Sequence, residues 1–244
     1  MDANLSDQIE NSHFRRSRLL RQYDMCESEA TSPRSAISVY KLTPRKHIYY
    51  VLSLYPDALR RVRAEHDQKF GGVSKAAEML CSDPTLVNDL PYTLAVIMES
   101  LRLFPPIGGS YRSGRVGQPL CCVHLKADGR DWPTYPFACF INDYAIMHHE
   151  DVFKDHELFI PERYLTKGPS DPYFVSPNAW RAFEKGPRDC IGKAMALIQI
   201  KIIIILTLSS FDFREMYADD TPLVNGHKMY QTLHVTAKPS QGCL

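Results

Sequence analysis

Phe183-Glu184-Lys185-Gly186-Pro187-Arg188-Asp189-Cys190-Ile191-Gly192 is the stretch of this chain that decides its fold. It places one cysteine beside an arginine and between two glycines, just before a long apolar run at residues 194–208. That run is too long for an ordinary strand and predicts a buried helix. Cys190 would then lie at the N-terminal end of a helix dipole, which favours a thiolate and makes the sulfur available as a metal ligand.

The residues around the cysteine suit a flat and bulky ligand. Gly186 and Gly192 let the backbone approach such a group and leave amide N–H groups available to the sulfur. Arg188 suits an anionic group on the same ligand. The alternative for a lone cysteine is a buried and inert side chain, because free cysteine is among the most buried residue types. The surrounding residues favour the ligand interpretation.

These ten residues resemble the cysteine-ligand loop of the haem-thiolate monooxygenases, the cytochrome P450 family. The family pattern is Phe-x-x-Gly-x-Arg-x-Cys-x-Gly, and its fixed positions are matched by Phe183, Gly186, Arg188, Cys190 and Gly192. The resemblance implies haem b as the cofactor, with Cys190 as the axial ligand of its iron and Arg188 on a propionate. It also implies oxygen insertion into a small organic substrate, with electrons from a separate reductase.

Two further segments resemble the same family. Glu99 and Arg102 stand three residues apart before Pro105-Pro106, and Arg163 follows Pro161-Glu162. Alone, such an i,i+3 pair is typical of an exposed helix face. The resemblance implies instead that Glu99, Arg102 and Arg163 form a partly buried charge network. This network would hold the cysteine loop in place and do no chemistry.

Arg112 is a further candidate for the cofactor site. It stands where members of the family often bind a haem propionate, and residues 107–110 before it would border the substrate pocket. An exposed loop arginine is an equally good interpretation of this residue.

The order of the segments follows the C-terminal half of the family's fold, and the resemblance covers residues 48–242. The predicted fold is therefore mainly α with small β-sheets, the proximal haem-side part of the cytochrome P450 fold. Residues 48–244 are expected to form this partial domain. Residues 1–47 have weak periodicity and are predicted to be a divergent, poorly ordered segment. Within the matched segments, the sequence most resembles members of the family from filamentous fungi that tailor secondary metabolites.

The N-terminal half of the family pattern has no match in the sequence. Oxygen activation there uses a helix with an acid–alcohol pair after a small-residue kink, so no catalytic residue is assigned. We expect a truncated gene product or an incomplete gene model, without turnover. One alternative is a non-catalytic remnant that binds haem weakly or not at all. Another is an unrelated helical protein with a structural cysteine.

Local signals set the expected ends of the other elements. A charged helix at 57–70 is expected to begin after Pro56 and to end at Gly71-Gly72. Ser74 is a candidate cap for the next short helix, and Asn88 or Asp89 for the helix before Pro105. Residues 238–242 are expected to be a turn in a closing β region.

Composition and charge exclude several other classes of protein. A formal net charge of +1 gives no electrostatic footprint for nucleic acid. The seven cysteines are irregularly spaced without a C-x-x-C pair, which argues against a disulfide framework and a structural zinc site. No signal peptide or membrane anchor is recognised, although eukaryotic members of the family are typically anchored to the endoplasmic reticulum. The expected partners are haem, a small hydrophobic substrate and a redox partner.

Overall fold

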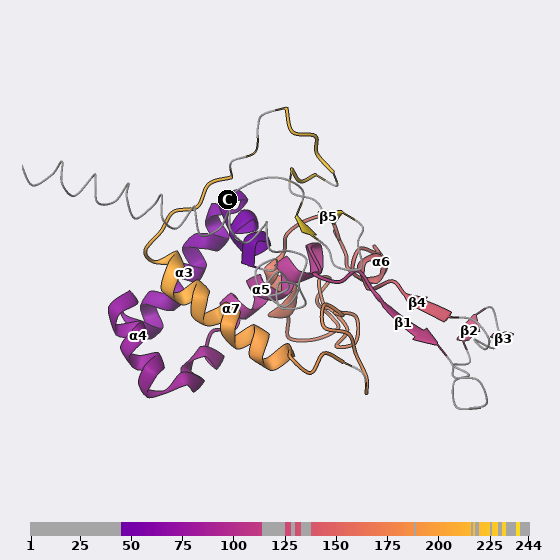
Figure 1. Ribbon diagram of the computed structural model, residues 1–244, viewed down its shortest axis with the longest axis horizontal. Coiled ribbons are helices and arrows are strands. Elements are labelled where there is room, and N and C mark those ends of the chain that lie inside the picture. Colours follow the sequence, from indigo (N-terminus) through magenta and orange to yellow (C-terminus); the bar gives the residue numbers. More distant parts are fainter. Residues whose placement is uncertain are drawn as a thin grey trace, which may run out of the picture. The chain divides into compact units, whose positions relative to one another are not determined.

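The computed structural model describes residues 45–113, 125–127, 130–132, 138–187, 189–215, 217, 220–224, 226–228, 231–232 and 238–239. All of them belong to one compact unit, Thr43–Leu244. Figure 1 shows its helices and short strand pairs.

Helices dominate the described residues. They are α3 (Pro56–Phe70), α4 (Val73–Ser82), α5 (Pro91–Leu103), α6 (Asp143–Met147) and α7 (Lys193–Leu208), with the 3-10 helices η1 (Pro84–Asn88) and η3 (Pro161–Tyr164). Residues 45–54 are helical as well. None of the described helices is long and apolar enough to cross a membrane.

Within the described ranges, the strands form three antiparallel pairs. They are β1 (Ser110–Ser113) with β4 (Ala138–Ile141), β2 (Leu125–Ala127) with β3 (Arg130–Trp132), and β5 (Gln231–Thr232) with β6 (Lys238–Pro239). The prediction of a mainly helical chain with small sheets is therefore confirmed. The predicted turn at residues 238–242 is wrong at its start, because Lys238 and Pro239 pair with Thr232 and Gln231. Proline is tolerated at the edge of such a two-stranded ladder.

The end of α3 follows its local signals, whereas the start of α4 does not. Gly71 adopts a left-handed conformation with φ 68°, and its N–H donates to the carbonyl of Asp67. Glycine adopts this conformation without the steric cost that other residues bear. The predicted Ser74 cap is wrong, because α4 begins directly after Gly72 and Ser74 lies inside its first turn.

The N-terminus of α5 is capped by a residue from another helix. Oε1 of Glu65, on α3, accepts a hydrogen bond from the backbone N–H of Tyr92 at 2.8 Å. Oε2 accepts from the N–H and the hydroxyl of Thr93 at 2.8 and 2.6 Å. The prediction of Asn88 or Asp89 as the cap is therefore wrong. A carboxylate brought by the tertiary fold satisfies the N–H groups that a local cap would otherwise take.

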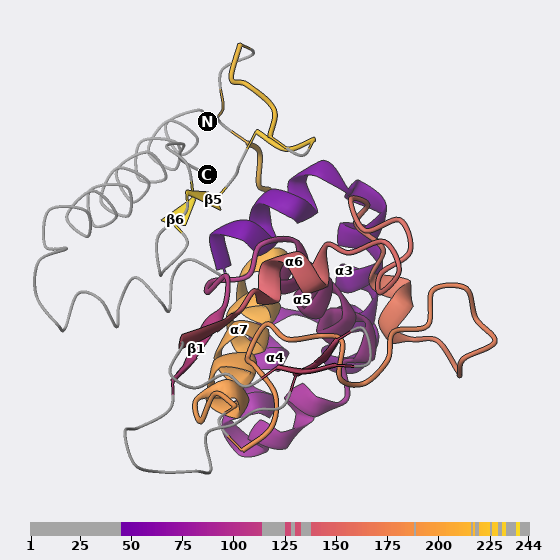
Figure 2. The same cartoon turned by 90° about the vertical axis from the view of Figure 1, so that its right-hand side faces the viewer.

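The main core lies around α5, which contacts α3, α6, α7 and η3 (Figure 2). It takes apolar side chains from the helix at 45–54, from α3, α5 and α7, and from the irregular segment after α6. Its most buried members include Ile48, Val51, Leu52, Val62, Val96, Ile97, Leu101, Met147, Phe153, Ile204 and Leu208. The apolar run predicted as a core helix is α7.

The first described helix begins before the expected domain boundary. Residues 45–47 are already helical. His47 is buried and stacks on Phe104 with ring centroids 4.8 Å apart. The expected boundary at residue 48 therefore falls inside a helix. The remainder of the segment predicted to be poorly ordered, residues 1–44, lies outside the described residues.

Candidate functional site

The cysteine loop, residues 183–192, closes on itself and leads directly into α7. The N–H of Cys190 donates to the carbonyl of Phe183 at 2.9 Å, and the N–H of Lys193 donates to the carbonyl of Cys190 at 3.1 Å. Cys190 is exposed and outside any disulfide. Cys190 is therefore not buried, contrary to the alternative interpretation. Its position before the 16-residue helix α7 is one where the helix dipole favours a negatively charged ligand atom.

The two glycines of the loop differ in what they provide. Gly186 has φ 88°, a conformation that glycine adopts far more readily than other residues. Gly192 has an ordinary φ of −83°. A Cβ added to Gly192 would lie 3.8 Å from Sγ of Cys190. Gly186 therefore permits the turn of the loop, and Gly192 leaves open space beside the sulfur.

Two arginines were predicted to contact the cofactor. Arg188 lies outside the described residues. Arg112 belongs to β1, opposite Cys139 in β4, and its side chain is outside the described part of the chain. Their proposed roles at the propionates stay predictions.

The structure brings Glu99, Arg102 and Arg163 together. Nε and Nη2 of Arg102 donate to the two carboxylate oxygens of Glu99, both at 2.9 Å. Nε of Arg163 donates to Oε1 of Glu99 at 3.0 Å. All three side chains are completely buried, more so than the partial burial expected from the sequence.

The remaining bonds of this network reach the segment between α6 and η3. Arg102 donates to the carbonyls of Met147 and Leu158 at 2.9 and 3.1 Å, and Arg163 donates to the carbonyl of Lys154 at 3.1 Å. Among the described residues, these bonds fix residues 147–163 against α5. Any hold that the network has on the cysteine loop is therefore indirect.

A second ionic cluster, missed by the sequence analysis, contacts the cysteine loop itself. Nε of Arg181 donates to Oδ1 of Asp143 at 2.8 Å, and Nη2 donates to Oε1 of Glu184 at 2.6 Å. The hydroxyl of Ser110 donates to Oε2 of Glu184 at 2.6 Å. Burial raises the pKa of Asp143 to about 6; Arg181 opposes this rise and the charge of Glu184 adds to it. No periodicity in the sequence marked this cluster, because Asp143 lies 38 residues from Arg181.

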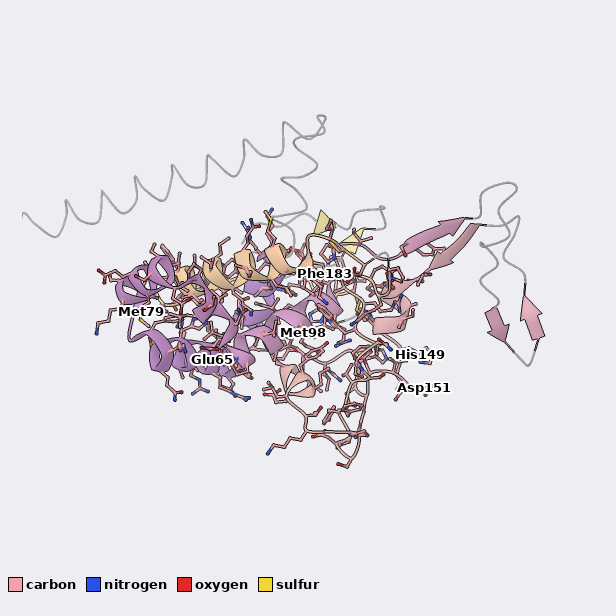
Figure 3. All side chains as sticks on the ribbon, turned by 90° about the horizontal axis from the view of Figure 1, so that it is seen from below. Glu65, Met79, Met98, His149, Asp151 and Phe183 are labelled. Carbon is pink, nitrogen blue, oxygen red and sulfur yellow. The ribbon has the colours of Figure 1, made fainter. Side chains whose placement is uncertain are left out.

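Trp180 attaches the beginning of the loop to α5. Its indole N–H donates to the carbonyl of Met98 at 2.9 Å, and its ring lies 5.9 Å from that of Phe183. Figure 3 labels Met98 and Phe183, two residues that Trp180 contacts. Because Met98 directly precedes Glu99, this contact joins the loop to the helix that carries the buried charge network. The sequence analysis missed this residue too.

The chain that follows Cys190 exposes several apolar side chains. Ile191 is fully exposed, and Met195 and Ile198 on the first turns of α7 are 56% and 39% exposed. A sulfur donor with apolar neighbours and open backbone beside it fits an iron porphyrin, which is large, flat and mostly apolar and accepts a thiolate ligand. The described residues near the cysteine are therefore compatible with haem.

A separate cavity of about 300 Å³ lies at the other end of α7. Its lining is Arg63, Asp67, Ser209, Ser210, Phe211 and Asp212. The 16 residues of α7 put it roughly 24 Å along the helix axis from the cysteine loop. It is therefore not part of the candidate site around Cys190.

Comparisons with known proteins show which family the sequence matches. The family model described as Cytochrome P450 matches residues 43–243. The chain is 34% identical to cytochrome P450 monooxygenase acrF of Aspergillus aculeatus, over 82% of this chain and 45% of that protein. It is 31% identical to polC of Polytolypa hystricis, over 80% of this chain and 36% of that protein. The chain thus spans less than half the length of these two relatives.

A third relative is covered more completely. Cytochrome P450 monooxygenase PC-23 of Penicillium crustosum is 34% identical over 70% of this chain and 81% of its own length. The arrangement of matched segments is therefore found in a relative of comparable size as well as in longer ones.

Proposed function

Because this chain belongs to the cytochrome P450 family, we propose that it supplies the cysteine-bearing side of a haem-dependent monooxygenase. Cys190 is the proposed axial ligand of the iron of haem b. The observation that carries the proposal is an exposed cysteine, outside any disulfide, that immediately precedes α7 in a loop closed by its own backbone. When bound, haem supplies the oxygen chemistry of the family, the insertion of one oxygen atom into a C–H bond.

The other motif residues would position the cofactor. The loop backbone holds the sulfur through the bond between Cys190 and Phe183. Gly186 permits the turn, and Gly192 keeps a side chain away from the sulfur. Arg188 and Arg112 are the proposed partners of the two propionates, because guanidinium groups bind carboxylates with two parallel hydrogen bonds.

The buried network of Glu99, Arg102 and Arg163 would act as support behind the site. It fixes the segment at 147–163 to α5, and the bond from Trp180 to Met98 fixes the start of the cysteine loop to the same helix. A rigid α5 would therefore set the position from which the loop presents its sulfur.

The proposed substrate is a small hydrophobic molecule of fungal secondary metabolism, with electrons delivered by a separate reductase. This proposal rests on family membership and on the fungal sources of the relatives, which are named as monooxygenases. This proposal about substrate and reductase is independent of the proposal that Cys190 binds haem iron, because the chain spans only part of the first two relatives.

The test is a carbon monoxide difference spectrum of the reduced, haem-reconstituted chain, with folding checked by circular dichroism. We expect a thiolate-type Soret band that is lost in Cys190→Ala. Cys81→Ala is the matched control, because Cys81 is the other exposed, unbridged cysteine among the described residues. A folded wild-type chain without this band, or a band that survives in Cys190→Ala, would overturn the assignment.

Turnover is measured separately, by product formation with a reductase. A chain that gives the thiolate band but no product would be a haem-binding member without catalysis. This result would contradict the proposed monooxygenase activity and leave the assignment of Cys190 intact.

A further inference from the structure

We infer that Arg181 is a positioning residue that clamps the cysteine loop to the base of the β1–β4 pair through Asp143, Glu184 and Ser110. This inference rests on the proposed function for its consequence at the haem. The clamp itself is a property of the chain alone and can be measured without the cofactor.

On the loop side, the bonds of the clamp flank the residue that closes the loop. Arg181 and Glu184 lie on either side of Phe183, whose carbonyl accepts the N–H of Cys190 at 2.9 Å. The N–H of Glu184 donates to the carbonyl of Arg181 at 2.9 Å, so these residues also form one turn. Movement of this turn would therefore move the carbonyl that holds Cys190.

The backbone of Glu184 gives an independent sign that this turn is held from outside. Its φ is 61°, which is uncommon for a residue other than glycine. Such conformations persist where the surroundings fix them. Both carboxylate oxygens of Glu184 are engaged, one by Arg181 and one by Ser110.

On the other side, the clamp ends on two elements that are themselves tied together. Ser110 begins β1 and pairs with Ile141, at the end of β4. Asp143 begins α6 two residues later, and the N–H of Tyr144 donates to the carbonyl of Gly108 at 3.0 Å. The anchor is therefore the base of a strand pair rather than a single side chain.

The charges make Arg181 the critical member. Its side chain is 19% exposed and lies between two carboxylates, those of Asp143 at 4% and Glu184 at 12% exposure. Without the guanidinium, Asp143 and Glu184 would both lose the ion pair that joins them through Arg181. The turn at 181–184 would then separate from α6 and release the loop.

Hydrogen exchange of the full chain without haem tests the clamp. Arg181→Lys keeps a positive charge but lacks the planar fork that reaches two carboxylates. We expect the Cys190 amide to exchange about tenfold faster in this variant, as for the loss of one charged hydrogen bond. The amides of α5 should stay protected. Arg60→Ala is the control, because Arg60 has an exposed partner, Asp57, on α3.

A second, less disruptive variant tests the clamp if Arg181→Lys does not fold. Ser110→Ala removes the hydroxyl that donates to Glu184 and leaves both ion pairs of Arg181 in place. It should raise exchange at Cys190 by less than Arg181→Lys, again without a change in α5. Unchanged protection of Cys190 in folded variants, or a loss of protection spread evenly over α5, would overturn the clamp.

The haem-reconstituted chain provides a second, spectroscopic readout. If the clamp positions the sulfur, Arg181→Lys should retain haem but convert part of the thiolate-type carbon monoxide band to a non-thiolate band. An unaltered band together with faster exchange at Cys190 would contradict its role at the haem. If the wild-type chain gives no thiolate band, the proposed function fails, and hydrogen exchange alone still decides whether the clamp exists.

Discussion

Arg163 and Glu99 are 64 residues apart in the sequence, yet Nε of the arginine lies 3.0 Å from Oε1 of the glutamate with both side chains fully buried. Glu99 also accepts two hydrogen bonds from Arg102 and one from the N–H of Ile160. One carboxylate is thus the ion-pair partner of two buried guanidinium groups. Its loss would leave both of them without a negative partner among the residues that the structure describes, which makes Glu99 the most sensitive position of the network.

The first prediction is a large loss of stability in Glu99→Gln. Removing one partner of a buried ion pair typically costs about 3–5 kcal/mol. Urea denaturation should therefore show the free energy of unfolding fall by about that amount, or the variant should fail to fold. Asp57→Asn is the control, since Asp57 and Arg60 are exposed partners, and exposed pairs contribute about 0–1 kcal/mol. Equal effects of the two variants would contradict a structural role for the network.

The second prediction concerns the cap that α3 provides for α5. Glu65→Ala removes the acceptor of three hydrogen bonds from Tyr92 and Thr93. The loss of a helix cap costs about 0.5–2 kcal/mol, and urea denaturation should show a decrease in this range. Glu78→Ala, on the exposed face of α4, should change stability by less than about 0.5 kcal/mol. If Glu65→Ala leaves the free energy of unfolding unchanged, α5 does not depend on this carboxylate.

The sequence predicted those features whose cause is local. Pro56 and Gly71 bound α3 because each restricts or permits the backbone at its own position. The apolar run before Leu208 forms α7 because its length suits a buried helix. The loop around Cys190 was recognised because its fixed residues fall within ten positions.

The features that were missed depend on residues far apart in the chain. Glu65 caps α5 by accepting from Tyr92 and Thr93, which lie 27 and 28 positions later, so the nearer Asp89 was the natural expectation. Arg181 was passed over because the segment around it has no helical period and its partner Asp143 lies 38 residues away on α6. The contact between Glu99 and Arg163 was expected only through resemblance to a family, because neither residue's surroundings predict their proximity.

The third prediction compares the two glycines of the cysteine loop. No atom lies within 4 Å of a Cβ built on Gly186, so Gly186→Ala is penalised only by its φ of 88°. The expected loss in stability is about 1–2 kcal/mol, measured by urea denaturation. Gly192→Ala has an ordinary φ and only van der Waals contact with Cys190 Sγ, so its stability should be nearly unchanged. A larger loss of stability in Gly192→Ala than in Gly186→Ala would contradict this description of the loop.

The fourth prediction concerns His66, whose Nε2 lies 2.9 Å from the hydroxyl of Thr93. Burial lowers its pKa from 6.5 to about 4, although the charges of Glu65 and Asp67 oppose this shift. The unfolded chain therefore takes up a proton at a higher pH than the folded chain. Relative to His66→Gln, the wild type should lose stability as the pH falls from 6.5 to about 4. If the difference in free energy of unfolding between the wild type and His66→Gln stays constant over this pH range, His66 is not buried in its neutral form.

The fifth prediction has the opposite sign and concerns Asp143. Because its pKa is raised from 3.8 to about 6, mainly by burial, the folded chain binds the proton more tightly than the unfolded chain. Its contribution to stability is therefore greatest at low pH and is lost as the pH rises through about 6. Urea titrations at successive pH values give the free energy of unfolding of the wild type minus that of Asp143→Asn. This difference should decrease as the pH rises from 3.8 to about 6. An increase over the same interval would mean that the ion pair with Arg181 outweighs the cost of burying the carboxylate.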